Sequence, residues 1–239
     1  MDWQPSSSYR YVLKRGMSGA DVAALQINLV AYGVLSGAAD GAFGPMTELA
    51  AKNFQERSHL TPDGLVGLLT QRALCLALSQ DAVKQYRLPD GLLTGIMANE
   101  SGFAVGAYAS HGDGGFDLGP YQMSFPPMVR TQANYVKAYN VKLMSVEAGK
   151  KFRTAKDSFR KAPKVSTDKR AWELAILSHN WPAAADNLAN LGSINRDASQ
   201  DDQSQNWILA ASGGAMSTPR QWVDHYIQKS SVFITSWPA

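Results

Sequence analysis

Cysteine is almost absent from this chain of 239 residues, which holds a single one, Cys75. A disulfide framework within one chain is therefore excluded, and nothing in the cysteine content requires an oxidising compartment. Cys75 lies in the apolar run 73–78, and a free cysteine among apolar neighbours behaves as a small hydrophobic side chain. We expect Cys75 to be a buried structural thiol rather than a nucleophile.

Long apolar runs are also missing. Residues 1–16 lack the apolar segment of a secretory signal, and no run approaches the roughly 18 apolar residues of a transmembrane helix. Hydrophobic residues make up 45% of the chain and charged residues 18%, which is typical of a folded globular protein and argues against disorder. We expect one large or two small domains, no stable membrane insertion and a monomer.

Several catalytic signatures are absent as well. No H-E-x-x-H motif, G-x-S-x-G motif or P-loop occurs. A zinc-dependent amidase or peptidase would need histidine, cysteine or aspartate ligands at ligand spacing. The four histidines are instead far apart in sequence: His59, His111, His179 and His225. We therefore expect no metal and no cofactor.

One short motif is present twice. Residues 40–47 read DGAFGPMT and residues 63–70 read DGLVGLLT, so both copies fit D-G-x-[FV]-G-x-x-T. Asp-Gly begins a tight turn, because glycine tolerates positive φ. The apolar position, Phe43 or Val66, is expected to be buried beneath that turn. Each copy then leads into a helix, and Pro45 suits a first helical position, where a missing N–H costs nothing.

The periodicity of apolar residues predicts a mainly α protein. The expected helices are, approximately, 18–32, 45–57, 68–79, 80–86, 90–101, 126–139, 145–160, 168–180, 182–191, 202–211 and 218–230. Strand signals are scarce, and only the glycine-rich stretch 102–125 offers a place for a short hairpin or irregular loops. We expect a polar lead-in over 1–11, a three-helix bundle over 12–78 and an α-rich domain over 79–239, joined without a long linker.

Local signals indicate some helix ends and faces. Ser18 and Asp21 fit an S-x-x-D capping pattern for the first helix, and Gly33 supplies its stop. The positions expected to face inward are Val22, Leu25 and Leu29 in the first helix, Leu49, Ala50 and Phe54 in the second, and Trp222, Val223, Tyr226 and Ile227 in the last.

The segment 12–78 resembles the three-helix peptidoglycan-binding domain carried by many cell-wall hydrolases. The resemblance rests on residues 13–33, 40–55 and 63–74 and covers about a quarter of the chain. It implies that the partner is bacterial peptidoglycan. It also implies that the repeated turns carry the wall-binding residues, namely Asp40, Gly41, Phe43, Asp63 and Gly64.

Positive charge is concentrated over 137–170. This stretch holds 11 lysines and arginines against three acidic residues, a local net charge of +8, while the whole chain carries +3. Two interpretations fit equally: a solvated helical surface with exposed lysines, or a face attracted to an anionic envelope. Nucleic acid is not expected as a partner, because no recognised binding motif accompanies the charge.

The stretch 89–103 carries the strongest sign of chemistry. An apolar stripe at helical spacing is formed by Leu92, Leu93, Ile96 and Met97. Glu100 continues this stripe near the C-terminal end of the expected helix, so it should point inward. Burial and the negative end of the helix dipole both favour the protonated carboxyl, which a general acid for glycoside cleavage needs. On spacing alone, a glutamate whose flexible stem carries its carboxylate to solvent fits as well.

Residues 100–123, ESGFAVGAYASHGDGGFDLGPYQM, resemble the lysozyme-like superfamily of goose-type lysozymes and soluble lytic transglycosylases. In that superfamily a helix-terminal Glu-Ser is followed by a glycine-rich loop and a G-[LP]-x-Q element, here residues 119–122. Residues 174–191 are loosely similar to its A-Y-N-x-G-P segment. The resemblance implies that Glu100 is the catalytic acid. It also implies glycan contacts at Ser101, Ser110, Tyr121, Gln122, Met123, His179 and Asn180.

The chain departs from the superfamily at several positions. Pro120-Tyr121 stands where Leu-Met is common, His179 stands where tyrosine is usual, and Trp181-Pro182 replaces x-Gly-Pro. These departures affect the glycan contacts rather than the acid.

A second carboxylate would decide the reaction. Asp113 lies where a goose-type enzyme places a loop aspartate and could activate a water, giving hydrolysis, and Asp117 is the other loop candidate. Asp113-Gly114 also fits a turn without chemistry. Without a second carboxylate, Glu100 would protonate the glycosidic oxygen and then accept the C6 hydroxyl proton of the same muramic acid. That route gives the 1,6-anhydro product of a lytic transglycosylase.

The two resemblances together are those of a modular bacteriophage endolysin, a bacteriolytic muramidase that cleaves the β-1,4 bond between N-acetylmuramic acid and N-acetylglucosamine. Such a protein waits in the host cytoplasm until the membrane is permeabilised and then reaches the periplasm and cell wall. A non-catalytic wall-binding or virion structural protein on a decayed lysozyme scaffold is the alternative. The intact Glu100, Gln122 and Asn180 favour the enzyme.

Overall fold

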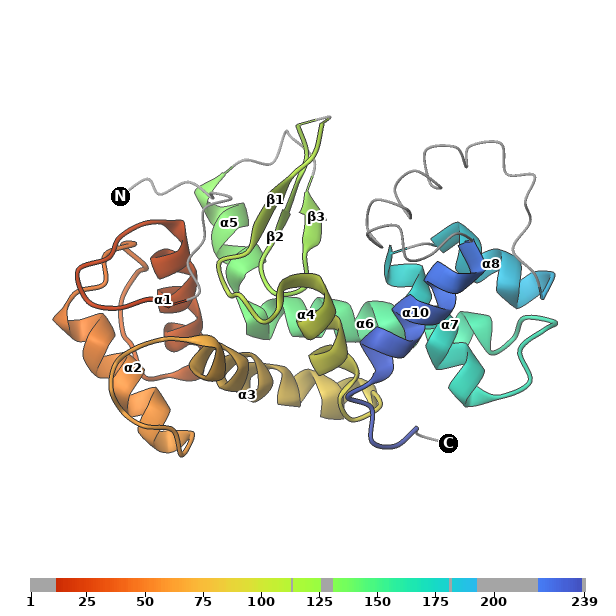
Figure 1. Ribbon diagram of the computed structural model, residues 1–239, viewed down its shortest axis with the longest axis horizontal. Coiled ribbons are helices and arrows are strands. Elements are labelled where there is room, and N and C mark those ends of the chain that lie inside the picture. Colours follow the sequence, from red (N-terminus) through yellow and green to blue (C-terminus); the bar gives the residue numbers. More distant parts are fainter. Residues whose placement is uncertain (1–11, 113, 126–130, 181, 193–218, 238–239) are drawn as a thin grey trace. The chain divides into compact units, whose positions relative to one another are not determined.

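The computed structural model describes residues 12–112, 114–125, 131–180, 182–192 and 219–237. Within these residues the chain is mainly helical with one small sheet, which confirms the predicted fold class (Figure 1). The helices are α1 (Ala20–Tyr32), α2 (Pro45–Arg57), α3 (Leu68–Tyr86), α4 (Leu92–Ser101), α5 (Gln132–Tyr139), α6 (Val141–Phe159), α7 (Asp168–Asn180), α8 (Pro182–Asn190) and α10 (Pro219–Ser231). The strands are β1 (Tyr108–Ser110), β2 (Phe116–Leu118) and β3 (Met123–Phe125).

The first helix begins without a capping side chain. Its N-cap residue is Gly19, which has no side chain to cap the helix, so the capping pattern predicted for Ser18 and Asp21 is wrong. The Asp21 side chain is buried, and its carboxylate accepts the N–H of the next residue, Val22, at 2.9 Å. The predicted stop is confirmed, because Gly33 adopts φ 90° and its N–H bonds two carbonyls of the last turn.

The second helix has the limits that the sequence predicted, with Pro45 in its first turn. Ala50 and Phe54 are buried as expected, but Leu49 is 53% exposed, so the prediction of an inward Leu49 is wrong. Residues four positions apart share one helix face, whereas the residue just before them is turned well away from it.

The segments predicted as two helices, 68–79 and 80–86, form the single helix α3. No glycine or proline separates them, so nothing in the sequence breaks the helix. Ser79 is buried, and its hydroxyl donates to the Leu76 carbonyl of its own helix at 3.1 Å. The domain boundary predicted at 78/79 therefore lies inside a continuous helix.

The glycine-rich stretch forms the expected hairpin and a third strand. The strands are antiparallel in the order β1-β2-β3. Asp117, at the centre of β2, lies opposite Ser124 of β3. Gly119, with φ 71°, turns the chain after β2, and a Cβ there would lie 2.9 Å from the Ala138 carbonyl oxygen. The turn therefore requires glycine for both its conformation and its close packing.

The chain divides into two compact units. The first holds Met1–Lys84 and Ile96–Ala148, and the second holds Gln85–Gly95 and Gly149–Ala239. Each unit takes two separate stretches of chain, whereas the sequence predicted two consecutive domains. The first unit thus contains α1 and α2 together with the sheet and α5.

A buried side chain of α1 holds the junction between α5 and α6 in the first unit. The Asn28 amide nitrogen donates to the Tyr139 carbonyl at 2.9 Å, and its side-chain oxygen accepts the Val141 N–H at 2.9 Å. Both backbone groups lie at helix ends, where intrahelical partners run out. A residue 111 positions earlier in the sequence therefore completes this junction.

In the second unit, α7 packs against α8 and α10 (Figure 1). The sequence predicted the limits of all three helices to within a residue or so. Tyr226 and Ile227 of α10 are buried as expected. The side chains of Trp222 and Val223 and the helix predicted over 202–211 lie outside the described residues.

The start of α4 lies very close to the end of α10, within the second unit. A Cβ at Gly95 would lie 1.7 Å from the Ser230 carbonyl oxygen, and one at Gly91 would lie 1.8 Å from that of Phe233. These distances are far inside van der Waals contact with rigid backbone atoms. Glycine at both positions is what permits the approach.

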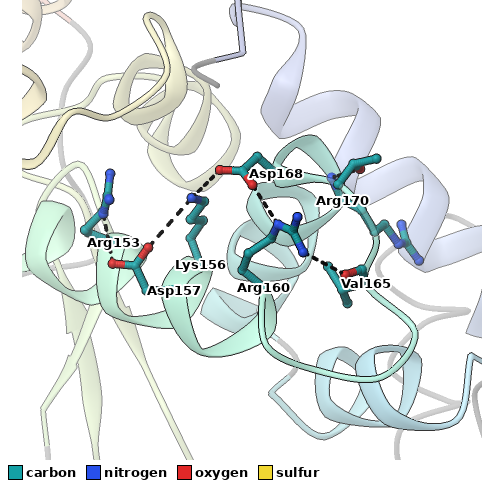
Figure 2. Close-up of polar contacts among 8 residues, drawn as sticks. Arg153, Lys156, Asp157, Arg160, Val165, Asp168 and Arg170 are labelled. Atoms are coloured by element: carbon teal, nitrogen blue, oxygen red, sulfur yellow. Dashed lines mark hydrogen bonds and ion pairs between the residues drawn. The ribbon is translucent and has the colours of Figure 1, made fainter.

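Some of the positive charges in the basic stretch 137–170 form ion pairs within the protein (Figure 2). The buried Lys156 lies 2.5 Å from Asp168 and 3.7 Å from Asp157, and Arg160 reaches Asp168 at 2.7 Å. Hydrogen bonds from Lys156 and then Arg160 hold the pKa of the Asp168 carboxyl below its ordinary value. These positive charges join α6 to the first residue of α7.

Candidate functional site

Glu100 lies one residue before the end of α4, as the sequence predicted. The stripe that leads to it is buried, and no side chain in it is more than 1% exposed: Leu92, Leu93, Ile96 and Met97. Glu100 itself is half-buried. The helix therefore runs from an apolar core to a glutamate that is partly exposed to solvent.

The hydroxyl of Ser101 joins two elements of the candidate site. It lies 3.1 Å from the Met97 carbonyl of its own helix and 3.0 Å from the Pro120 carbonyl. Pro120 belongs to the turn 119–122 that follows β2. The structure therefore brings the Glu100-Ser101 helix end and the G-P-Y-Q turn together.

The turn 119–122 is stabilised by a hydrogen bond between its own residues. Gln122 has φ 45°, a left-handed conformation that is uncommon without glycine, and its side-chain amide donates to the Gly119 carbonyl at 2.9 Å. Tyr121 is 1% exposed, and its hydroxyl bonds that of Ser145 at 2.8 Å. Burial raises the pKa of Tyr121. The glycan contacts predicted at Tyr121 and Gln122 stay predictions, and Tyr121 would have to leave the core to make one.

Asp117 is part of a polar cluster that the sequence did not indicate. One carboxylate oxygen lies 2.8 Å from His111 Nε2, and the other accepts the Ser124 hydroxyl at 2.6 Å. Ser124 lies opposite Asp117 on the neighbouring strand β3, and His111 directly follows β1. This carboxylate therefore links all three strands. Its partners come from different strands, so only the strand register could have shown them.

The other predicted site residues are more dispersed. Ser110 ends β1 and is exposed, whereas Met123 begins β3 and is half-buried. Asp113 lies outside the described residues. His179 and Asn180 end α7, which belongs to the second unit. The roles predicted for these residues stay predictions.

A buried glutamine of α1 holds the first repeated turn. The Gln26 amide nitrogen donates to the Asp40 carboxylate at 2.7 Å and to the Thr47 hydroxyl at 3.0 Å. Its side-chain oxygen accepts the Gly41 N–H at 2.8 Å. One amide group therefore contacts the first, second and last positions of the D-G-x-[FV]-G-x-x-T motif.

Gln55 of α2 makes the same three contacts in the second repeat. Its amide nitrogen lies 2.9 Å from the Asp63 carboxylate and 3.2 Å from the Thr70 hydroxyl. Its oxygen accepts the Gly64 N–H at 2.9 Å. The two turns are thus built in the same way, which explains why the motif recurs at these positions. Gln26 and Gln55 lie at different spacings from their motifs, so sequence inspection missed them.

The motif residues are engaged inside the domain. Each aspartate also accepts the backbone N–H two positions later, and this bond, followed by the glutamine amide, holds the pKa of Asp40 and Asp63 below its ordinary value. Phe43 and Val66 are buried beneath the turns, as predicted. Wall binding by the motif residues stays a prediction.

Apolar side chains are exposed at equivalent positions of the two repeats. Met46 is 70% exposed and Leu69 is 69% exposed, each directly before the threonine of its motif. The sequence did not single out these side chains, and both are open to contact with an external polymer.

Within the described part of the chain, no group of three or more histidine, cysteine, aspartate or glutamate residues is arranged to hold a metal ion. Cys75 is buried as predicted, and burial raises the pKa of its thiol. None of the described helices is both long and apolar enough to cross a membrane.

Comparison with known proteins identifies the N-terminal region. Residues 18–74 match the family described as "Putative peptidoglycan binding domain", which confirms the peptidoglycan-binding domain predicted there. The chain is 40% identical over 93 residues to a "Probable N-acetylmuramoyl-L-alanine amidase" of Bacillus licheniformis, which is 37% of this chain and 26% of that protein. It is 44% identical over 70 residues to a spore cortex-lytic enzyme of Bacillus cereus, which is 29% of this chain and 27% of the relative.

A further relative is N-acetylmuramoyl-L-alanine amidase CwlL of Bacillus licheniformis, 34% identical over 98 residues, which is 37% of this chain and 27% of that protein. The chain therefore spans about a quarter of the length of the curated relatives it matches.

Proposed function

We propose that this protein degrades bacterial peptidoglycan. Two findings support this: residues 18–74 match a peptidoglycan-binding family, and the similar proteins are named as cell-wall lytic enzymes. As an endolysin, it would reach the wall only after a separate protein has permeabilised the membrane.

The bond cut is the β-1,4 linkage between N-acetylmuramic acid and N-acetylglucosamine, and Glu100 is the general acid. The observation that carries this assignment is the contact between Ser101 and Pro120, which joins the Glu100 helix end to the G-P-Y-Q turn. A half-buried carboxyl at the end of an apolar helix stripe is suited to donate a proton to the leaving glycosidic oxygen.

Hydrolysis needs a base for the attacking water. Of the two candidate carboxylates, Asp117 has both oxygens bonded, one to His111 and one to Ser124, so we assign the base to Asp113. Asp113 would accept a proton from water on the far face of the sugar while Glu100 protonates the leaving oxygen.

Two other activities have support of their own. The engagement of Asp117 within the sheet also fits an enzyme in which Glu100 acts alone, as in a lytic transglycosylase. The names of two relatives favour an amidase, which would cut between the muramoyl group and the stem peptide.

Mass spectrometry of digested sacculi distinguishes the three activities. A muramidase releases glycan fragments with ordinary reducing ends, a transglycosylase releases anhydro sugars lighter by one water, and an amidase releases stem peptides from uncut glycan. The expected result is the first.

Glu100→Gln tests the acid. The amide cannot donate an acidic proton, so the rate should fall by about 10²–10⁴-fold while the melting temperature stays unchanged. Glu147→Gln is the matched control, because Glu147 is an exposed glutamate of α6 and should tolerate the change. A folded Glu100→Gln protein with near-normal activity would show that the site is elsewhere.

A further inference from the structure

The chain makes an unusual reversal directly after Glu100 and Ser101. Gly102 has φ 60° and Phe103 has φ 68°, so two successive residues adopt the left-handed conformation. Phe103 is a bulky residue for which this conformation is strained, and its ring is buried. Strained backbone persists only where the surrounding structure holds it in place, and it occurs preferentially at functional sites.

One face of α3 supplies the contacts that hold this reversal. The Gln71 side-chain oxygen accepts the Val105 N–H at 3.0 Å, and Gln71 is buried. The Cys75 thiol lies 3.8 Å from the Phe103 carbonyl oxygen. The Arg72 guanidinium lies over the Phe103 ring, 5.7 Å from its centroid.

The origin of these three side chains is unexpected. Gln71 and Arg72 lie within residues 18–74, the part of the chain that matches a peptidoglycan-binding family. All the residues involved belong to the first compact unit. A segment that matches a peptidoglycan-binding family is thus in direct contact with the turn that ends the Glu100 helix.

We propose that Gln71 is a positioning residue for the Glu100 site, so that α3 of the peptidoglycan-binding domain fixes the backbone from which the acid acts. The inference rests on the proposed glycosidase function. Gln71 is suited to this role because its buried side-chain oxygen accepts one specific N–H, that of Val105. Val105 lies three residues after Gly102, where the reversal begins. Without that acceptor the N–H would be buried and unpaired, and the strained turn would relax. A displacement of about 1 Å at a catalytic group is enough to cost up to 10²-fold in rate.

The test uses the full chain with three substitutions, each assayed for kcat and KM on soluble glycan strands, for sacculus binding and for thermal melting. Gln71→Met keeps the side-chain length and removes the acceptor. Arg72→Ala removes an exposed contact without opening the core. Ser79→Ala is the matched control, since Ser79 is a buried polar residue of the same helix whose hydroxyl donates to a carbonyl of that helix.

The expected result is a fall in kcat of roughly tenfold or more for Gln71→Met, with KM and sacculus binding within about twofold of the parent. Arg72→Ala should lower kcat about two- to fivefold, the size of an exposed cation–π contact. Ser79→Ala should leave kcat unchanged. A merely structural role for Gln71 would lower the melting temperature without this selective loss of kcat.

A Gln71→Met protein that melts like the control and keeps the parental kcat overturns the proposal. If Gln71→Met does not fold, Arg72→Ala decides, and an unchanged kcat there overturns it as well. The parent and Glu100→Gln are assayed alongside. If the parent cuts no glycan, or if Glu100→Gln is fully active, the proposed function fails and the inference with it. If Glu100→Gln is inactive and Gln71→Met is fully active, the positioning role of Gln71 is overturned and the proposed function stands.

Discussion

A buried glutamine can donate and accept through one planar amide, and Gln26 and Gln55 use both capacities on the same motif positions. Each bonds an aspartate carboxylate, a threonine hydroxyl and the backbone N–H of a buried glycine. The two aspartates are ionised partners in these networks, so their protonation has a consequence for stability.

We expect the peptidoglycan-binding repeats to lose stability in acid. The pKa values of Asp40 and Asp63 are lowered in the folded state, mainly by backbone N–H groups and the glutamine amides. Their contribution is therefore complete above the unfolded-state pKa, about pH 4, and is lost as the pH falls through the lower folded-state values. Melting temperatures measured from about pH 5 down to about pH 2 should fall steeply.

The double variant Asp40→Asn/Asp63→Asn should be less stable near neutrality and should lose less on acidification. Asp81→Asn serves as the control, because Asp81 is exposed on α3 and outside both turns. A double variant with the parental pH dependence would contradict the role of these two carboxylates.

Asp113→Asn tests the assigned base. If Asp113 activates water, the substitution should lower the rate at least roughly tenfold, and the parent's products should carry ordinary reducing ends. Steady-state rates on soluble glycan, with mass spectrometry of the products, give both readouts. A silent substitution together with anhydro products would mean that Glu100 works alone.

Asp117→Asn is the matched comparison for that experiment, four residues further along the chain. An amide cannot accept hydrogen bonds from both His111 and Ser124, so the free energy of unfolding should fall by about 1 kcal/mol or more. Chemical denaturation measures this loss. A rate loss greater than that of Asp113→Asn, in a protein of parental stability, would instead make Asp117 the base.

At the scale of the elements, α4 and the end of α10 approach each other through their backbones rather than through packed side chains. Gly95 lies on the helix that ends in Glu100, and its missing side chain leaves room for the Ser230 carbonyl. The sequence shows two glycines in this region and gives no sign of their partner. Two effects of opposite sign decide what alanine would do there.

Gly95→Ala should destabilise the protein. Alanine favours a helix interior by up to about 1 kcal/mol over glycine. Its Cβ would lie 1.7 Å from a backbone oxygen, and overpacking of this kind costs typically 1–3 kcal/mol. The net effect in denaturant titration should therefore be a loss. Gly112→Ala is the control, since a Cβ there meets nothing within 4 Å.

At the scale of the whole molecule, the helices that match the peptidoglycan-binding family and the sheet belong to one compact unit. Their contacts include the Asn28 bonds to the α5–α6 junction and the Gln71 bond to Val105. Both are hydrogen bonds to buried backbone groups, which are costly to leave unpaired. This integration predicts how the chain responds to being cut.

A chain of residues 80–239 should lose cleavage of soluble glycan strands as well as sacculus binding. The cut falls inside α3 and removes Asn28 and Gln71. Activity assays and near-ultraviolet circular dichroism would show the loss, with full-length Glu100→Gln as the folded but inactive reference. Parental activity of the shortened chain on soluble glycan would show that the domain is only an anchor.

The sequence predicted what depends on neighbouring residues and missed what depends on distant ones. Pro45 and Gly33 mark helix ends through their own backbone chemistry, so α2 and the end of α1 were correct. The apolar stripe before Glu100 was readable for the same reason. The partner of Gln71 is 34 residues away and that of Asn28 is 111, and no local pattern encodes such pairs.

The close approach of Gly95 and Ser230 also affects the order in which the chain folds. During synthesis the ribosome releases the start of α4 long before it has made α10. Gly91 and Gly95 therefore lack their α10 contacts while the intervening chain is synthesised. Contacts between residues so distant in sequence form late, because a long loop must close first. The helix that carries Glu100 is therefore fully packed only after α10 has been synthesised.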